Sequence, residues 1–457
     1  MNITHSGFSV AFRNALKPFL FVVFMPVIGA AQSTGYSFSL QQAIDYAIQN
    51  QVSIKNAELD RQISKSKVDE LIGVGLPQIN GKADINHFIE IPTSFVPGEF
   101  FGGSAGTYFP VQFGQPYTSS VGVSASQLLF DGSYVVGLQA SKTYTELAVK
   151  NLSQSKIETA AAVSKAYYLV LVAQERLKQL ESDVVRLKKL SDDTKAMYEN
   201  GFVEKIDNDR VELNYNLVEN ARTNTQRFLE NSYNILKYRM GMDLKTNLEL
   251  TEKITDFQFD PTLLKRDSVD YTARIEYSIL QTQYRLSELD VKKNKFSRLP
   301  TFMLFGSYSA NASRNEFNIF QSGYKWYPTA IVGASVSLPL FGGFQKYSQT
   351  TQAKLNQQKV ENAFYLMEQG INLEYNNAIT TLNNSIDKLK TQEKNRDLAR
   401  DVTRVSKIKY DQGVGSNLEV VDAEASLREA ETNYYTALLE AIIAKIDLDV
   451  ALGNIKY

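Results

Sequence analysis

Four short stretches of the chain alternate between apolar and polar residues with a period of two. The apolar positions are Ile79, Ala83 and Ile85; Val121, Val123 and Ala125; Phe302, Leu304, Tyr308 and Ala310; and Ala330, Val332, Ala334, Val336 and Leu338. The positions between them are mostly small and hydroxylic or amidic, with few charges. This alternation predicts β-strands with one apolar and one polar face. Each stretch has the length of about 9–12 residues that a tilted membrane-spanning strand needs.

Two much longer segments are free of proline and follow a helical pattern. They run from residue 134 to 200 and from residue 345 to 412, so each predicts a helix of roughly 100 Å at about 1.5 Å per residue. The first segment has apolar residues at two heptad positions, namely Val163, Val170, Leu177 and Val184, and Ala166, Ala173, Leu180 and Leu187. This seam predicts a coiled coil. The seam of the second segment (Ala378, Leu382, Leu389) is weaker and more polar.

Each long helix is predicted to reverse at a glycine and to be followed by a return helix. Gly201 and Gly413 are placed for the left-handed backbone of such a turn. The apolar residues predicted to face the long helix are Leu213, Leu217, Ala221 and Phe228 in the first return helix, and Leu427, Ala430, Tyr434, Leu438 and Ala441 in the second. Shorter helices, from about residue 40 to 71 and from 269 to 296, lead into the strands. The strands should therefore lie at the opposite end from the glycine turns.

The same order of motifs occurs twice along the chain. Leu129-Phe130-Asp131-Gly132 recurs as Leu340-Phe341-Gly342-Gly343, Tyr198-Glu199-Asn200-Gly201 recurs as Tyr410-Asp411-Gln412-Gly413, and Leu76-Pro77 recurs as Leu299-Pro300. A period this long indicates a duplicated half-molecule rather than a solenoid. We expect residues 32–242 to form the first repeat, with a helix, a strand hairpin and a long helical hairpin. Residues 243–266 then form a linker in an equatorial position, and residues 267–457 form the second repeat.

The first 31 residues have the pattern of a secretory signal peptide. Arg13 and Lys17 precede an apolar run over residues 19–28, and small residues at 29–31 offer a cleavage site. The alternative is an N-terminal membrane anchor, but a run of about ten residues is too short to span a bilayer of about 30 Å. We therefore expect residues 1–31 to be removed on export.

Composition excludes several classes of function. The chain has no cysteine, which rules out disulfides and thiolate chemistry, and its only histidine after the signal segment is His87. Little remains for acid–base catalysis or a metal centre, and no phosphate loop or nucleophile motif is present. We expect no enzymatic activity, no cofactor and no resident metal. A formal net charge of −1 does not favour nucleic acid as a partner.

Four strands cannot close a membrane barrel, and an open sheet edge is not tolerated in lipid. The smallest membrane barrels have about eight strands, so two or more chains must contribute. Three copies would supply twelve strands, but the pattern by itself does not distinguish a dimer from a trimer. The predicted fold class is an α+β membrane protein with an internal two-fold repeat. Each chain contributes long coiled-coil hairpins and four strands to a shared outer-membrane β-barrel.

The doubled motifs resemble the TolC-like outer-membrane efflux factor family over the whole mature chain. The most specific stretch runs from Tyr410-Asp411-Gln412-Gly413 through Val414-Gly415-Ser416-Asn417 to Asp422-Ala423. The resemblance implies a homotrimer with a twelve-stranded barrel in the outer membrane of a Gram-negative bacterium and a helical tunnel in the periplasm. It also implies an exit duct of a tripartite efflux or type I secretion system. Its partners would be a periplasmic adaptor, an inner-membrane transporter that opens the periplasmic tip, and outer-membrane lipid.

The resemblance extends to single positions near the glycine turns. Glu419 and Asp422 match an acidic ring at the periplasmic gate, where they would favour cations and raise each other's pKa. Tyr410 and Asp207 match the network that holds the gate closed. The basic partner of that network is replaced by Gly415, so the network cannot be transferred unchanged. The alternative interpretation of these acidic residues is a solvated helical tip, in which Asp207 and Asp209 favour the positive helix N-terminus.

The two repeats differ most in the loop after their first strand. Residues 87–117 form a long segment rich in Phe, Gly and Pro, and the second-repeat counterpart is shorter. Long outward loops are usual in outer-membrane proteins. Such a loop could constrict the mouth or contact a surface ligand, or it could be inert. The alternative function for the whole chain is a trimeric adhesin-like structural protein without a transport role, although the glycine reversals do not suit a continuous stalk.

Overall fold

The alternating segments form one antiparallel sheet of four strands in the computed structural model, which describes residues 35–254, 269–319, 321–323 and 325–457. Its strands are β2 (Gln78–His87), β5 (Tyr117–Phe130), β7 (Thr301–Arg314) and β8 (Tyr327–Ser337), in the order β2-β5-β7-β8. Both strands of each predicted hairpin are therefore neighbours, and β5 joins the two hairpins by pairing with β7. The predicted signal peptide lies outside the described residues.

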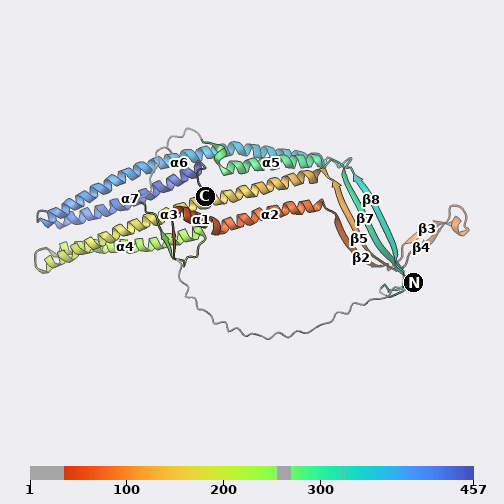
Figure 1. Cartoon of the computed structure of the whole chain (residues 1–457), viewed down its shortest axis with the longest axis horizontal. Helices are drawn as coiled ribbons and strands as arrows, with labels where there is room; N and C mark the ends of the chain where they lie inside the picture. Colours follow the sequence, from red (N-terminus) through yellow and green to blue (C-terminus); the bar gives the residue numbers. More distant parts are fainter. Residues whose placement is uncertain (1–34, 255–268, 320, 324) are drawn as a thin grey trace, which may run out of the picture.

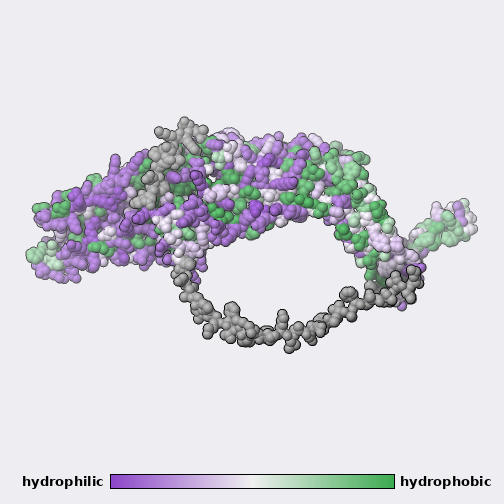
Figure 2. Space-filling model, viewed as in Figure 1, coloured by the Kyte–Doolittle hydropathy of each residue, from purple (hydrophilic) through white to green (hydrophobic). Residues whose placement is uncertain are grey.

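The strand register brings the predicted apolar positions onto one face. Ile79 lies opposite Ala125, Val123 lies opposite Tyr308, and Tyr308 lies opposite Ala330. Because side chains alternate along a strand, the small polar residues share the other face. This prediction from the sequence is confirmed. The apolar face is uncovered within the chain, since Val332 is 90% exposed, and apolar residues colour the sheet region in Figure 2.

Two long helical hairpins lead away from the sheet, as Figure 1 shows. The first consists of α3 (Gly132–Glu199) and α4 (Lys205–Met240), and the second of α6 (Gln345–Asp411) and α7 (Asn417–Ala451). The corresponding helices of the two hairpins match in length, with 68 and 67 residues for the long helices and 36 and 35 for the return helices. The glycine turns lie at the end opposite the sheet, which confirms the predicted polarity.

Shorter helices run alongside the sheet-proximal halves of the long ones. They are α1 (Leu40–Asn50), α2 (Val52–Val74) and α5 (Ile275–Phe296), with a 3₁₀ turn η4 (Tyr271–Ala273) before α5. Helix α2 packs on α3, α3 on α5, and α5 on α6, so four helices form one layer in the same order as the strands that continue them. The main core lies where α1, α3, α4 and α7 meet, and its fully buried side chains include Tyr167, Leu236 and Ile442.

The structure corrects the predicted helix from residue 40 to 71. This segment is divided into α1 and α2 at Gln51, whose backbone is extended at φ −64° and ψ 129°. The Gln51 side chain accepts a hydrogen bond from the amide of Val52 at 2.8 Å and donates one to the carbonyl of Arg239 at 3.2 Å. The break between α1 and α2 therefore allows Gln51 to contact the end of α4. This contact is distant in sequence, so the local periodicity could not predict it.

The predicted inward face of the first return helix is wrong except at Ala221, which packs against the core shared by α3, α4 and α7. In α4 the residues Leu213, Leu217 and Phe228 are exposed, and the buried stripe contains Val211 and Val218 instead. Polar residues occupy much of this stripe, namely Asn214, Thr225 and Ser232. The sequence pattern was misleading because the larger apolar residues lie on the face that this chain leaves uncovered. In α7 the predicted residues Leu427, Leu438 and Ala441 are buried as expected.

Two small sheets complete the described fold. Strands β1 (Tyr36–Phe38) and β6 (Leu248–Leu250) pair in parallel, so part of the predicted linker 243–266 is structured, while residues 255–266 of it lie outside the described residues. The predicted long loop 87–117 forms a hairpin of β3 (Thr93–Pro97) and β4 (Tyr108–Gln112) joined by the 3₁₀ turn η1 (Gly98–Phe101). This hairpin projects beyond the sheet and exposes Phe95, Phe100 and Tyr108 (Figures 1 and 2).

Within the described part of the chain, the helices are too polar to include a membrane-crossing segment.

Candidate functional site at the hairpin tips

The two hairpin tips are built by the same backbone device. At the end of α3, Gly201 has φ +76°, and the amide of Phe202 donates to the carbonyl of Met197 at 2.8 Å. At the end of α6, Gly413 has φ +75°, and the amide of Val414 donates to the carbonyl of Lys409 at 3.0 Å. These bonds satisfy the last carbonyls of each long helix and require the left-handed conformation that glycine adopts without strain.

Gly415 has a steric reason to be glycine. Its amide donates to the carbonyl of Lys409 at 3.1 Å, so the turn folds back closely on the end of α6. A Cβ atom at this position would lie 2.9 Å from the Cβ of Lys409 and 3.0 Å from the amide nitrogen of Tyr410. A basic side chain cannot be accommodated here without moving the turn. Close packing of the turn against the end of α6 therefore favours glycine at position 415.

Helix α7 starts immediately after this turn and presents the predicted acidic residues. The Ser416 side chain caps the helix by accepting from the amide of Glu419 at 3.2 Å. Glu419 and Asp422 follow on the same exposed face, three residues apart. Neither carboxylate forms a hydrogen bond or ion pair with the part of the chain that the structure describes. Both are therefore free to act on solvent, ions or another molecule.

Tyr410 and Asp207 do not bond to each other within the chain. The Tyr410 hydroxyl lies 4.0 Å from the sulfur of Met197, and its ring packs against the core formed by α3, α4 and α7. The Asp207 carboxylate lies 3.7 Å from Arg210 on its own helix. The two tips are linked instead through Asn417, whose side-chain amide donates to the carbonyl of Asp207 at 2.9 Å. Arg210 and Asn417 thus take part in the contacts at the hairpin tips. The sequence analysis had named only Tyr410 and Asp207 for these contacts.

A second polar region, which the sequence analysis missed, lies farther from the tips between the two hairpins. Arg186 on α3 contacts Asp183 at 2.9 Å and Glu424 of α7 at 2.8 Å. Arg400 on α6 contacts Glu431 of α7 at 3.2 Å. We call these five residues the inter-hairpin ion cluster. Its three carboxyl groups belong to residues that are only 4–5% exposed, so they are removed from water almost entirely.

Burial dominates the electrostatics of this cluster. It raises the pKa of Glu431 to about 7, an effect that Asp183 strengthens and Arg400 opposes. Burial also raises the pKa of Glu424 against the attraction of Arg186, and it raises the pKa of Asp183. A sequence signal for the cluster exists: Glu424 and Glu431 are seven residues apart and lie on the buried seam with Val420 and Leu427. Two glutamates at one seam position of a coiled coil require buried partners.

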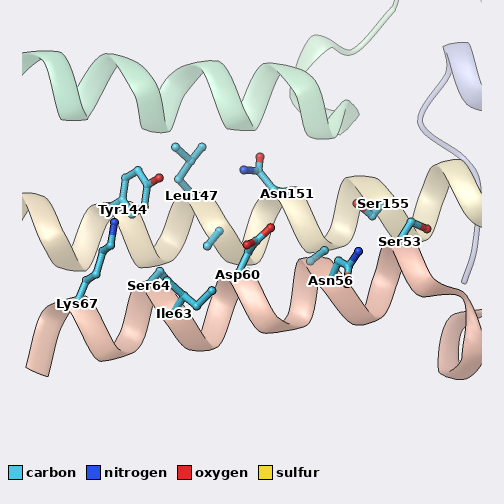
Figure 3. A pocket seen from close by; sticks show the side chains of 12 residues that line it. Ser53, Asn56, Asp60, Ile63, Ser64, Lys67, Tyr144, Leu147, Asn151 and Ser155 are labelled. Carbon is cyan, nitrogen blue, oxygen red and sulfur yellow. The ribbon is translucent and has the colours of Figure 1, made fainter.

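The structure also contains a polar groove between α2 and α3, remote from the tips (Figure 3). It has a volume of about 500 Å³, and its lining includes Asp60, Lys67, Tyr144 and Asn151 beside Ile63. The side chains come from both helices along several turns, as the view shows. Helix α2 is the outer helix of the layer, so this groove marks a place where the two helices are not closely packed.

Comparison with known proteins agrees with this architecture. Residues 280–454 match the family described as outer membrane efflux protein. The outer membrane protein TolC of Vibrio cholerae is 24% identical over 345 residues, which cover 74% of this chain and 77% of that protein. The alkaline protease secretion protein AprF of Pseudomonas aeruginosa is 22% identical over 346 residues, covering 73% of this chain and 68% of that protein.

A solved structure extends the comparison to nearly the whole described fold. The open state of the Neisseria gonorrhoeae MtrE outer membrane channel superposes with a TM-score of 0.69 and 19% identity, covering 91% of this chain and 88% of that one. The description of the matched family and the name of the Vibrio cholerae relative agree with the predicted outer-membrane location. The resemblance to the TolC-like outer-membrane efflux factor family is therefore confirmed, with an outer membrane efflux protein domain at residues 280–454 and the fold of these channels over nine-tenths of the chain.

Proposed function

We propose that three copies of this chain form an outer-membrane exit duct of a tripartite efflux or type I secretion system. The observation that carries the proposal is the sheet β2-β5-β7-β8, which is open at β2 and β8 within the described chain. One face of the sheet is apolar and uncovered, and the other is polar. In a twelve-stranded barrel, the strand edges would pair between copies, the apolar face would contact lipid and the polar face would contact water. Such a barrel would leave no backbone hydrogen-bonding group of the sheet unpaired in the membrane.

The helices support the same assembly. The layer α2-α3-α5-α6 follows the strand order, and its two end helices, α2 and α6, each have a neighbour on only one side of the layer within the described chain. Three such layers would close into a tunnel that continues the barrel. We further propose residues 32–242 and 267–457 as two repeats of one structural unit, joined by residues 243–266. The matched lengths of their long and return helices support this division.

We place the periplasmic gate at the hairpin tips, where an adaptor protein and an inner-membrane transporter would act. Glu419 and Asp422 carry exposed carboxylates on one face of α7. Three copies would bring six carboxylates to the entrance, which favours cations. The name of one relative, an alkaline protease secretion protein, agrees with export, and the exported substrate of this chain stays open. Tyr410, Asp207 and the turn glycines are proposed to set the tip geometry rather than to contact cargo.

The test of the duct is conductance of the purified full chain in planar bilayers. We expect discrete single-channel currents from a trimeric species. A trimer that inserts into the bilayer and yet shows no conductance, even after the tips are removed by proteolysis, would instead support the adhesin-like alternative. That alternative needs only a stable stalk and makes no provision for a polar inner face on the sheet.

The test of the acidic ring is the variant in which Glu419→Ala and Asp422→Ala are combined. We expect lower cation selectivity and weaker block by multivalent cations, because the carboxylates no longer attract them. The control is Glu429→Ala, which removes an exposed acid from the same helix away from the tip. Unchanged selectivity and unchanged block in the double variant would show that the two residues are only part of a solvated tip.

A further inference from the structure

The inter-hairpin ion cluster joins three helices that belong to different hairpins. Asp183 and Arg186 come from α3 of the first hairpin, and Arg400, Glu424 and Glu431 come from α6 and α7 of the second. The bond from Arg186 to Glu424 crosses directly between the hairpins at 2.8 Å. Asp183 and Glu431, both almost fully buried, also influence each other's pKa across the same boundary. One ion pair, from Arg186 to Glu424, therefore joins α3 directly to α7.

The cationic groups around the cluster are unevenly distributed among its carboxyl groups. Three carboxylates face two guanidinium groups inside the cluster. Lys407 on α6 and Arg428 on α7 face Glu424, and the Arg428 guanidinium is also bound to Asn214 of α4 at 2.9 Å. The Asp183–Glu431 pair is faced by Arg186 and Arg400, by the neutral Tyr435 hydroxyl and by the Gln179 side-chain amide, which donates to Asp183 at 3.4 Å. Two neighbouring negative charges in a buried site are strongly disfavoured, so this pair favours a state in which one of its carboxyl groups is protonated.

The link between the hairpins should respond to pH near neutrality. The pKa of Glu431 is about 7 in the docked arrangement, because of burial first and of Asp183 second, against an ordinary value of 4.5. A carboxyl group with a raised pKa binds its proton more tightly in the docked state than in an open, solvated one. Its contribution is complete below the ordinary pKa and is lost as the pH rises through about 7.

We propose that the inter-hairpin ion cluster is a proton-dependent link that positions the second helical hairpin against the first. With one proton shared by Asp183 and Glu431, the cluster holds α7 on α3. Without that proton, two like charges face each other inside the interface and the hairpins separate more readily. This goes beyond the proposed duct, because separation of the hairpins is measurable in the full chain whether or not it conducts ions.

A cysteine reporter can measure this separation, because the natural chain contains no cysteine. Val420→Cys places a thiol at a fully buried position of α7, in the core shared with Leu187 of α3 and Val211 of α4. Val414→Cys places a thiol at the tip, where the natural side chain is 78% exposed. The ratio of the two labelling rates with a neutral thiol reagent cancels the ordinary pH dependence of the thiolate and reports the open population.

We expect this ratio to rise about tenfold between about pH 6 and about pH 8.5 in the purified full chain. The figure follows from a carboxyl pKa of about 7 when docked and 4.5 when solvated. Glu431→Gln keeps the shape of the protonated carboxyl group and cannot lose the proton, so the ratio should remain low at both pH values. Asp183→Asn should have the same effect through the other member of the pair. Glu429→Gln, an exposed neighbour on α7, should respond like the natural chain.

Three results would overturn the proposal. The labelling ratio could stay within twofold across the pH range in the natural background. It could rise equally in the Glu431→Gln and Asp183→Asn variants, which would assign the response to other groups. It could also rise equally for Val136→Cys, a fully buried position of α3 near the sheet, which would indicate general loosening of the fold rather than separation of the hairpins.

Discussion

The replacement Arg186→Met gives the strongest test of how the two hairpins are held together. The guanidinium group contacts Asp183 at 2.9 Å and Glu424 at 2.8 Å, and both of these carboxyl groups belong to residues that are at most 5% exposed. Methionine keeps an unbranched apolar side chain but removes the charge. Both acidic side chains then remain in the interface without their shared cation. Leaving a buried charge unpaired is what makes the removal of one partner strongly destabilising.

Removing one partner of a buried pair costs about 3–5 kcal/mol. The Arg186 side chain is 33% exposed, so solvent screens part of its charge and the lower end of that range applies, about 3 kcal/mol. At about 1.36 kcal/mol per power of ten, this corresponds to roughly a hundredfold change in the local opening equilibrium. The effect should be smaller at about pH 6 than at about pH 8, because Glu424 and Asp183, whose pKa values burial raises, can then take up protons.

Hydrogen exchange of the α7 amides between Val420 and Leu438 measures this opening directly. The matched control is Arg404→Met on α6, which removes an arginine from a pair with Asp401 at 3.4 Å in which both side chains are more than 60% exposed. Such surface pairs contribute at most about 1 kcal/mol. If Arg186→Met lowers protection no more than Arg404→Met does, the ion cluster does not hold the hairpins together and the reasoning above is refuted.

Two further replacements test local features of the fold by thermal unfolding followed by circular dichroism. Gly241→Ala should lower the melting temperature, because Gly241 has φ +70° and an added Cβ would lie 2.8 Å from the carbonyl oxygen of Asn50; the left-handed conformation alone costs about 1–2 kcal/mol. Gly370→Ala in the interior of α6 meets no atom within 4 Å and should be neutral or stabilising, so equal losses would contradict the steric account. Asp131→Ala removes the α3 cap that accepts from the Tyr134 amide and from Thr301, both at 2.8 Å, and should cost about 1–2 kcal/mol. No change in the Asp131 variant would mean that the helix start is fixed by the strand alone.

Local chemistry accounts for the parts of the fold that were predicted correctly. The long helices end within two residues of the predicted glycines, because Gly201 and Gly413 supply a backbone conformation that few other residues adopt. The sheet faces were predictable since side chains alternate along a strand, and the register preserves that alternation except at the shift between Leu128 and Phe130 of β5. The doubling of motifs predicted two equivalent hairpins before any contact was known.

The sequence did not predict which polar residues become buried. Leu213 and Leu217 are more apolar than Asn214, yet Asn214 is the buried residue, and it accepts a hydrogen bond from Arg428 of α7 at 2.9 Å. Glutamate is also common on solvated helix faces, so the residue type of Glu424 and Glu431 does not indicate burial. Only their seven-residue spacing on the α7 seam distinguishes them. Likewise, Gln51 breaks a helix because it reaches Arg239, which is 188 residues away in the chain.

The sequence by itself determined the elements, their order, their doubling and the class of protein, because periodicity, turn chemistry and composition act over a few residues at a time. Only the tertiary structure decided how the hairpins contact each other, where α1 ends, and that Asp183, Arg186, Arg400, Glu424 and Glu431 meet in one buried cluster. Those features arise where groups from distant segments exchange their contacts with water for contacts with one another. The free energy of that exchange is set by burial and distance in space, which no local pattern contains.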